Sequence, residues 1–356
     1  MQLYDVVRTV HLERVQALGA ETHKVTILYR ERRYDFDSEL AKTLALQRAG
    51  AWRSFWYAAR HDIDVLEVAE PYVVQSALRS LLVIAAARAR SRVRRRPPPR
   101  VVSYAIENLS PYESAPRLPL KARLKRRALI VFVPTLWKRL DRVAFGTGEA
   151  ARLYGAQFGG HEPPVTRLFE SIPTAENPGV KDPAPVLVFL GDMSIRKGFP
   201  DVLSAWARVA AEAPTARLML VGRGAGVADA RLLAASDDRV GVLVDPPRDA
   251  IFETLRSAKV LVLPSRRMPL WKEQVGLPIL EGLARGCLIV TTTETGIAGW
   301  LSAHGHWVVP EAAVSEALPH ALVEALTSAR SPESVIADLP PTEGRAAAQE
   351  WMYREE

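Results

Sequence analysis

Two glutamates, a glycine and a proline stand close together in the stretch VLPSRRMPLWKEQVGLPILEGLARG, which begins at Val262. Glu273 and Glu281 are separated by seven residues, with Gly276 and Pro278 between them. Proline suits the first turn of a helix, so we expect a helix to begin here, with Glu281 about one turn inside it. Free amides at a helix start favour phosphate. If a nucleotide binds at this helix start, Glu281 is placed to accept hydrogen bonds from its ribose hydroxyls. The alternative is that Glu281 only stabilises the helix dipole.

A second cluster, GDMSIRKGF, begins at Gly191, between an apolar run and a predicted helix that starts at Phe199. Arg196 and Lys197 lie beside that helix start. Backbone amides, the helix dipole and two cations all favour a diphosphate at such a position. By itself, the same sequence also fits a solvated surface turn.

Together, the two clusters resemble the retaining GT-B glycosyltransferases of family 4 (glycosyl transferases group 1). The resemblance rests on two signals and on their order along the chain. The first is the upstream turn that ends in KG, at Lys197 and Gly198. The second is the pair of glutamates separated by seven residues, which follows the dipeptide PS and includes the run GLPILEGLARG. It covers roughly residues 186–310. It implies a GT-B fold, α/β, with two Rossmann-like doubly wound domains and a cleft between them. It also implies transfer of a hexosyl group from a nucleoside diphosphate sugar to a hydroxyl, with retention, in glycan, polysaccharide or glycolipid synthesis.

The resemblance also implies roles for individual residues. Lys197 and Arg196 would hold the donor diphosphate, Glu281 would bind the ribose, and Glu273 would contact the donor sugar. The expected donor-binding residues are those that match the family's motifs: Gly191, Arg196, Lys197, Glu273, Val275, Gly276, Leu277 and Glu281. In this family the leaving diphosphate helps to deprotonate the acceptor, so no dedicated general base is required.

Two positions depart from the family's pattern. Asp192 stands where the family often has an arginine, so Arg196 must supply the second cation. Glu107 and Asn108 stand in YAIENLSP, where the family often has a histidine. Glu273 and Glu107 are therefore the candidate catalytic residues. Three hypotheses compete with this one: a GT-B relative such as an epimerase, a non-catalytic relative that binds a sugar nucleotide, and a nucleic-acid-binding protein that uses the basic first half of the chain.

No metal or other cofactor is expected. The triplets DID from Asp62 and DFD from Asp35 look like DxD metal motifs, but the first leads into a buried strand and the second lies in a polar loop. His304 and His306 have no third ligand nearby. The glycines of VGRGAG, from Val221, have the wrong spacing for a dinucleotide fingerprint.

Charge is distributed unevenly along the chain. Residues 1–170 contain 29 Lys and Arg against 17 Asp and Glu, a net charge of +12, whereas the remainder has 18 against 23, a net charge of −5. The segment KARLKRRALIVFVPTLWKRL, from Lys121, mixes cations with Leu, Phe and Trp, as segments at membrane surfaces do. The other basic run, RARSRVRRRPPPR, has no aromatic residues for base stacking, so nucleic acid is not an expected partner. A solvated basic face is the alternative to an anionic membrane surface.

The elements that must position these residues alternate between short strands and helices, which is typical of parallel sheets covered by helices. In the first half, helices are expected near 7–18 and 72–90, and the strands are VTILYR, IDVLEVAEP, RVVSYA and RVAFGT. The predicted helix near 7–18 leaves almost no room for a strand before it, so the first βα unit is expected to be incomplete. In the second half, the expected strands are the apolar runs VLVFL, RLMLV, RVGVLV, KVLVLP and CLIVTT. Ligands of such sheets bind at the carboxyl ends of the strands.

A chain of 356 residues is long enough for two domains. The Pro-rich connector at 172–185 places an acceptor-side domain at 1–171 and a donor domain at 172–338. By resemblance, a last helix within 339–356 would cross back to the first domain.

The single cysteine, Cys287, excludes an internal disulfide, and the N-terminus lacks the apolar core of a secretory signal. We therefore expect a cytoplasmic protein that is peripheral to the inner face of the cell membrane.

Overall fold

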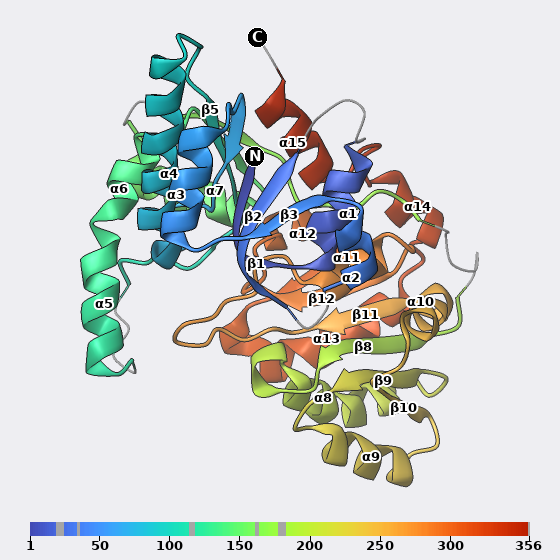
Figure 1. Cartoon of the computed structure of the whole chain (residues 1–356). Helices are drawn as coiled ribbons and strands as arrows, with labels where there is room; N and C mark the ends of the chain where they lie inside the picture. Colours follow the sequence, from blue (N-terminus) through green and yellow to red (C-terminus); the bar gives the residue numbers. More distant parts are fainter. Residues whose placement is uncertain (19–24, 34–35, 114–117, 161–163, 177–182, 355–356) are drawn as a thin grey trace. The chain divides into compact units, whose positions relative to one another are not determined.

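The computed structural model describes residues 1–18, 25–33, 36–113, 118–160, 164–176 and 183–354 (Figure 1). The chain divides into two compact units. The first consists of residues 1–146, 151–169 and 346–356, and the second of residues 147–150 and 170–345.

The first unit is built on a parallel sheet with strand order β3-β2-β1-β4-β5-β6-β7. Its strands are β1 (Gln2–Val7), β2 (Thr26–Arg32), β3 (Ala45–Arg48), β4 (Val65–Glu67), β5 (Arg100–Ala105), β6 (Arg142–Phe145) and β7 (Val165–Leu168). Its helices are α1 (Thr9–Ala17), α2 (Ser38–Lys42), α3 (Ala51–Arg60), α4 (Val74–Val93), α5 (Leu120–Ile130), α6 (Phe132–Trp137), most of α7 (Gly148–Phe158) and most of α15 (Gly344–Tyr353). Strands and helices alternate, as the sequence predicts.

The expectation that the first βα unit is incomplete was wrong, because β1 pairs with β2 on one side and β4 on the other. Its sequence, QLYDVV, is not continuously apolar, and its polar side chains have partners inside the unit. Asp5 forms an ion pair with Arg79, with 3.0 Å between Oδ1 and Nη1. The Gln2 side-chain amide donates to the Tyr353 hydroxyl at 2.9 Å. Paired polar groups therefore replace the apolar run that normally marks a central strand, although Gln2 Oε1 is buried without a partner among the described residues.

The second unit has a six-stranded parallel sheet with strand order β10-β9-β8-β11-β12-β13. Its strands are β8 (Val186–Asp192), β9 (Arg217–Arg223), β10 (Val240–Val244), β11 (Val260–Leu263), β12 (Leu288–Thr292) and β13 (Trp307–Val309). Its helices are α8 (Phe199–Glu212), α9 (Val227–Ser236), α10 (Arg248–Ser257), α11 (Leu277–Leu283), α12 (Ala298–Ala303), α13 (Val314–Thr327) and α14 (Pro332–Ala337), with the 3-10 turns η1 (Ile195–Lys197) and η2 (Glu311–Ala313). Each of the five apolar runs in this half forms the strand that the sequence predicts.

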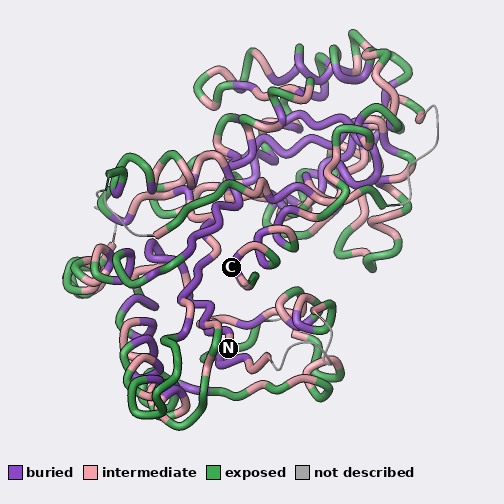
Figure 2. Tube along the Cα trace, turned by 90° about the horizontal axis from the view of Figure 1, so that it is seen from above, coloured by how far each residue is buried: buried purple, intermediate pink, exposed green. Residues whose placement is uncertain are grey.

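The core of the second unit lies on both faces of β8, β11 and β12, whose central residues are buried (Figure 2). Phe189, Val262 and Ile289 are fully covered, and Trp206 of α8 and Leu322 of α13 belong to the same cluster. Each such side chain stabilises the fold by about 1.5–3 kcal/mol through burial. Because β8 and β11 are hydrogen-bonded neighbours, the loops that follow them meet at one edge of the sheet.

Helix α15 packs against the sheet of the first unit. Ala348 and Met352 are buried in a cluster with Val102 and Ala144. Guanidinium groups bind the carbonyls at the end of the helix, where cations stabilise the helix dipole. Arg142 Nη1 donates to the carbonyl oxygens of Trp351 at 2.6 Å and Arg354 at 2.9 Å, and Arg100 Nη1 donates to that of Tyr353 at 3.3 Å.

No helix in the described ranges has both the length and the apolar character that a membrane span requires.

Candidate functional site

The loop after β8 lies directly against the loop after β11 in the second unit. Gly198 adopts a left-handed φ of 69°, and a Cβ at this position would lie 2.0 Å from the carbonyl oxygen of Pro264. The Arg266 amide donates to the carbonyl oxygen of Arg196 at 2.9 Å. Only glycine fits this close approach. The contact brings the RKG turn next to the segment that carries Glu273.

Lys197 and Glu273 form a buried ion pair in this position. The Lys197 Nζ donates to Glu273 Oε2, and the Ser265 hydroxyl donates to the same oxygen at 3.0 Å. Lys197 is 9% exposed and Glu273 is 8% exposed. The structure therefore joins the residue expected to hold the diphosphate to the residue expected to contact the sugar, although they are 76 residues apart.

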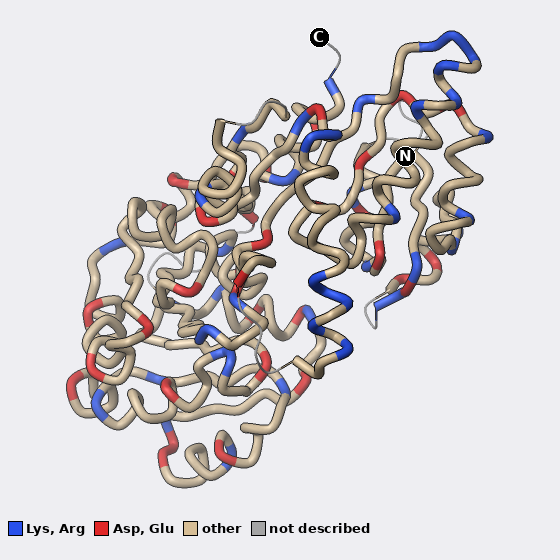
Figure 3. Tube along the Cα trace, turned by 90° about the vertical axis from the view of Figure 1, so that its left-hand side faces the viewer, with Lys and Arg blue, Asp and Glu red and all other residues tan. Residues whose placement is uncertain are grey.

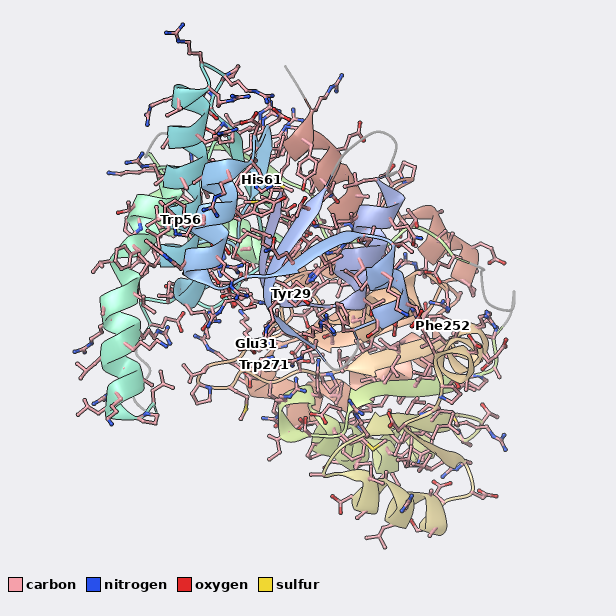
Figure 4. The ribbon with its side chains drawn as sticks, in the orientation of Figure 1. Tyr29, Glu31, Trp56, His61, Phe252 and Trp271 are labelled. Carbon is pink, nitrogen blue, oxygen red and sulfur yellow. The ribbon has the colours of Figure 1, made fainter. Side chains whose placement is uncertain are left out.

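Trp271 also belongs to this cluster, although it is not among the residues expected from the sequence (Figure 4). The Arg196 guanidinium lies 4.9 Å and the Lys197 Nζ 5.3 Å from the centre of its ring. Arg196 also forms an ion pair with Asp192, with 3.0 Å between Nη2 and Oδ2. Both partners are about two-fifths exposed, so a ligand in solution can reach the Arg196 guanidinium. An aromatic residue two positions before Glu273 was the available signal.

The start of α11 provides hydrogen-bond donors beside the ion pair. Gly276 has a left-handed φ of 78° and caps the helix, with Pro278 in the first turn as predicted. Among the described residues, no group accepts a hydrogen bond from the backbone amides of Val275 and Gly276. The Val275 side chain packs against the core, and that of Leu277 is 61% exposed. Any contribution of these three residues to anion binding therefore comes from the backbone.

Glu281 lies one turn into α11, as expected, with a half-buried side chain. Burial raises the pKa of its carboxyl, while the nearby Arg248 and Arg285 oppose the shift. In the described part of the chain, no group donates a hydrogen bond to this carboxylate, although Arg285 Nη1 donates to the Glu281 backbone carbonyl at 2.9 Å. The carboxylate is therefore available to accept hydrogen bonds from a ligand.

The loop after β12 holds Glu273 from the other side. Glu273 and Thr295 form an isolated parallel bridge, and the Gly296 amide donates to the Glu273 carbonyl at 3.1 Å. The hydroxyls of Thr291 and Thr295 lie 3.0 Å apart and are buried. No sequence pattern marks these threonines, since Thr291 stands inside an apolar strand and Thr295 in the loop that follows it.

Glu107 belongs to the first unit, at the carboxyl end of β5, whereas the expected donor-binding residues belong to the second unit. The Glu107 amide donates to both carboxyl oxygens of Glu70, at 3.2 and 3.1 Å. Tyr154 donates its hydroxyl to Glu70 at 3.1 Å. Burial, and secondarily the charge of Glu107, raise the pKa of Glu70 to about 8. Glu70 thus fixes the backbone that carries Glu107.

The acidic triplet near β4 is occupied by ion pairs. Asp62 pairs with Arg90 at 2.8 Å and with Arg96 at 3.1 Å, and Asp64 pairs with Arg96 at 3.0 Å. Asp35, in the other triplet, lies outside the described residues. In the described ranges, no three His, Cys, Asp or Glu side chains are grouped as metal ligands.

The two candidate histidines have structural partners. His306 is buried, and its Nδ1 accepts a hydrogen bond from the Ile289 amide at 3.2 Å. Burial lowers the pKa of His306 to about 3, so the ring is neutral. His304 stacks on Trp300, with 4.0 Å between the ring centres.

Residues 184–328 match the model of the family described as Glycosyl transferases group 1. This segment contains both clusters of expected donor-binding residues. No curated protein sequence matches the chain.

Several solved structures are similar over nearly the whole chain, and three of them serve as examples. The apo form of the lipopolysaccharide outer core galactosyltransferase WaaB has a TM-score of 0.65 at 10% identity, covering 98% of each chain. HepE from Anabaena, in complex with UDP and glucose, has a TM-score of 0.60 at 15% identity, covering 98% of this chain and 94% of that one. Sucrose-phosphate synthase from Thermosynechococcus elongatus has a TM-score of 0.60 at 15% identity, covering 99% and 96%. The fold is GT-B, with two Rossmann-like domains, as the sequence predicts.

Proposed function

We propose that the protein is a retaining glycosyltransferase of family 4, which moves a hexosyl group from a nucleoside diphosphate sugar to a hydroxyl acceptor. The family match over 184–328 and the GT-B fold support glycosyl transfer. The WaaB structure is described as a galactosyltransferase, and HepE is described in complex with UDP and glucose. The observation that carries the proposal is the buried Lys197–Glu273 pair beside two unused backbone amides at the start of α11.

In this proposal, donor binding opens the ion pair. A diphosphate carries more charge than the Glu273 carboxylate and accepts hydrogen bonds from several donors at once. It therefore competes for Lys197 and also takes hydrogen bonds from Arg196 and from the amides of Val275 and Gly276. Glu273, still oriented by the Ser265 hydroxyl, is then free to accept hydrogen bonds from the donor sugar.

The rest of the donor contacts follow from the same geometry. The half-buried carboxylate of Glu281 accepts hydrogen bonds from the ribose hydroxyls. Trp271 holds the side chains of Arg196 and Lys197 through contacts with its ring face. Leu277 contributes its backbone amide alone, because its side chain is exposed.

The chemical step breaks the bond between the anomeric carbon and the diphosphate oxygen. A new bond forms between that carbon and the acceptor oxygen, on the same face, and the acceptor proton passes to the departing diphosphate. Lys197, Arg196 and the amides stabilise the charge that develops on the diphosphate, so the proposal requires no divalent metal. Glu107 is proposed to bind the acceptor, at the carboxyl end of β5.

We further propose that the protein is cytoplasmic and that α5 rests on an anionic membrane surface. None of the residues of α5 is buried. Leu120, Leu124 and Val131 are 61%, 56% and 62% exposed, and their spacing of four and seven residues places them on one face. By the same helical spacing, Lys121 and Arg123 flank this face and Arg127 lies at its margin, between Leu124 and Val131 along the chain. Figure 3 shows basic residues along this part of the chain. This arrangement is typical of interfacial helices, and it would present a lipid-linked acceptor.

Release of nucleoside diphosphate from a panel of UDP-, GDP- and ADP-sugars tests the enzymatic proposal. We expect slow hydrolysis of one donor in the absence of acceptor, and none after the substitution Lys197→Ala. If wild-type protein binds every nucleotide without turning over any donor, with or without candidate acceptors, the protein is a binding protein and the proposal is wrong.

A further inference from the structure

A cavity of about 900 Å³ lies at the amino-terminal edge of the first unit's sheet, by the first residues of β4, β5 and β6. Its wall contains the rigid segment Pro97–Pro99 and five basic side chains: Arg88, Arg92, Arg96, Arg100 and Arg142. Two carboxylates, Asp64 and Asp141, also line it. The lining therefore carries five positive charges and two negative ones. Its volume is in the range of small-ligand sites.

Several guanidinium nitrogens around the cavity have no partner among the described residues. The Arg92 side chain forms no hydrogen bond or ion pair with any described residue. Among the same residues, Arg88 uses only Nη2, which donates to the Arg139 carbonyl at 3.0 Å and lies 3.8 Å from Asp141. Arg100 uses only Nη1, on carbonyl oxygens at the end of α15. Unused donors that converge on one hollow are suited to a multiply charged anion.

The geometry is largely fixed in advance of binding. Arg142 is 7% exposed and holds the end of α15, while Arg96 is held by Asp62 and Asp64. The turn after α4 that carries Arg96 is strongly basic (Figure 3). Like charges held together in a hollow raise the local positive potential, which a bound anion relieves.

We propose that this cavity binds a ligand that carries two or more phosphoryl groups. The cavity is distinct from the candidate acceptor position at Glu107, because β5 separates the two edges of the sheet by roughly 17 Å. A ligand bound there cannot be the reacting group. It is either a soluble phosphorylated molecule or the phosphorylated headgroup of a lipid, and both share the same recognition chemistry.

Calorimetric titration of the full chain with pyrophosphate, in the presence of saturating UDP, tests the proposal. UDP occupies the proposed donor site, so the remaining pyrophosphate binding reports on the cavity. We expect one site, weakened roughly tenfold by Arg92→Gln. The matched control is Arg53→Gln, an exposed arginine on α3 outside the cavity lining, which should leave the affinity unchanged.

The two variants distinguish binding in the cavity from diffuse attraction of anions to the protein surface. If Arg92→Gln has no effect, or if both variants weaken binding equally, the attraction is diffuse and the proposal is wrong. If free pyrophosphate does not bind but vesicles containing a lipid with a diphosphate headgroup do, with loss in Arg92→Gln and not in Arg53→Gln, the phosphoryl source is a lipid headgroup. Failure of UDP to bind would count against the proposed function, and the pyrophosphate titration would still test the cavity.

Discussion

In the second unit, the cations at the carboxyl ends of the strands are paired with carboxylates, whereas many cations of the first unit have no partner among the described residues. Lys197 is buried against Glu273, and Arg196 is paired with Asp192. In the first unit, Arg92 and the basic residues beside the apolar face of α5 are exposed. A buried, compensated cation can exchange one specific anion for another. An exposed, uncompensated cation attracts anions at longer range and is screened by salt.

The largest effect is expected from the basic residues of α5, which form no ion pair with a described residue, although Arg126 donates to the carbonyl oxygens of Ser110 and Pro111. Neutralising Lys121, Arg123, Lys125, Arg126 and Arg127 together should abolish binding to anionic vesicles, since each basic residue contributes about 1 kcal/mol near such a surface. Co-sedimentation with vesicles of increasing anionic fraction measures this, and binding should fall at high salt. A matched control is neutralisation of Arg208, Arg231 and Arg256 in the second unit. Wild-type protein that stays in the supernatant at low salt would rule out membrane docking.

The buried ion pair of Lys197 and Glu273 should affect nucleotide binding and not membrane binding. Lys197→Ala should weaken UDP binding by about tenfold or more, because it removes a charge-assisted contact of roughly 1.5–3 kcal/mol and leaves Glu273 unpaired near the diphosphate. Adding Glu273→Gln should restore part of the affinity by removing that repulsion. Calorimetry measures both, with the exposed Arg208→Ala as the control. Unchanged affinity in Lys197→Ala would exclude this lysine from the donor site.

A smaller effect is expected at Glu281, which has no charged role towards the diphosphate. Glu281→Gln should weaken binding of UDP severalfold while leaving unchanged the pyrophosphate binding that UDP displaces, since only UDP has ribose hydroxyls. Glu253→Gln, on the exposed face of α10, is the control. Equal loss for both ligands would mean that Glu281 acts through the structure of α11 and not through the ribose.

The smallest effect is expected from metal removal. Turnover should persist in EDTA, because Arg196, Lys197 and backbone amides meet the phosphate charge in this proposal. Complete loss of turnover in EDTA, restored by manganese, would show that these groups are insufficient.

The two units also differ in how well their strands could be predicted from the sequence. The five runs in the second unit are apolar on both faces and were recognised as strands, whereas β1 carries Gln2 and Asp5 and was missed. The strands β3 and β7 are at the edges of their sheet, and β7 is exposed throughout, so neither has the apolar signature of a buried strand. Hydrophobic patterning reports burial, and it fails where polar groups are satisfied inside the fold or where a strand is exposed.

The candidate site could be predicted in part. The residue types and the helix start at Gly276 were visible as local patterns, because proline and glycine constrain the backbone within a few residues. The pairing of Lys197 with Glu273, and the approach of Trp271 to both cations, depend on contacts between distant segments. The arginine-lined cavity likewise combines residues 88–100 with 141–142. Long-range contacts of this kind have no signature in a local sequence window.

The most direct test of the central claim is the anomeric configuration of the first sugar product. Proton NMR of freshly added donor, in EDTA, distinguishes the anomer that forms first from the one that appears later by mutarotation. A retaining transfer from the Lys197–Glu273 site predicts that the first-formed anomer has the same configuration as the donor, and that Lys197→Ala abolishes its formation. First appearance of the opposite anomer, or equal formation in Lys197→Ala, would contradict the account.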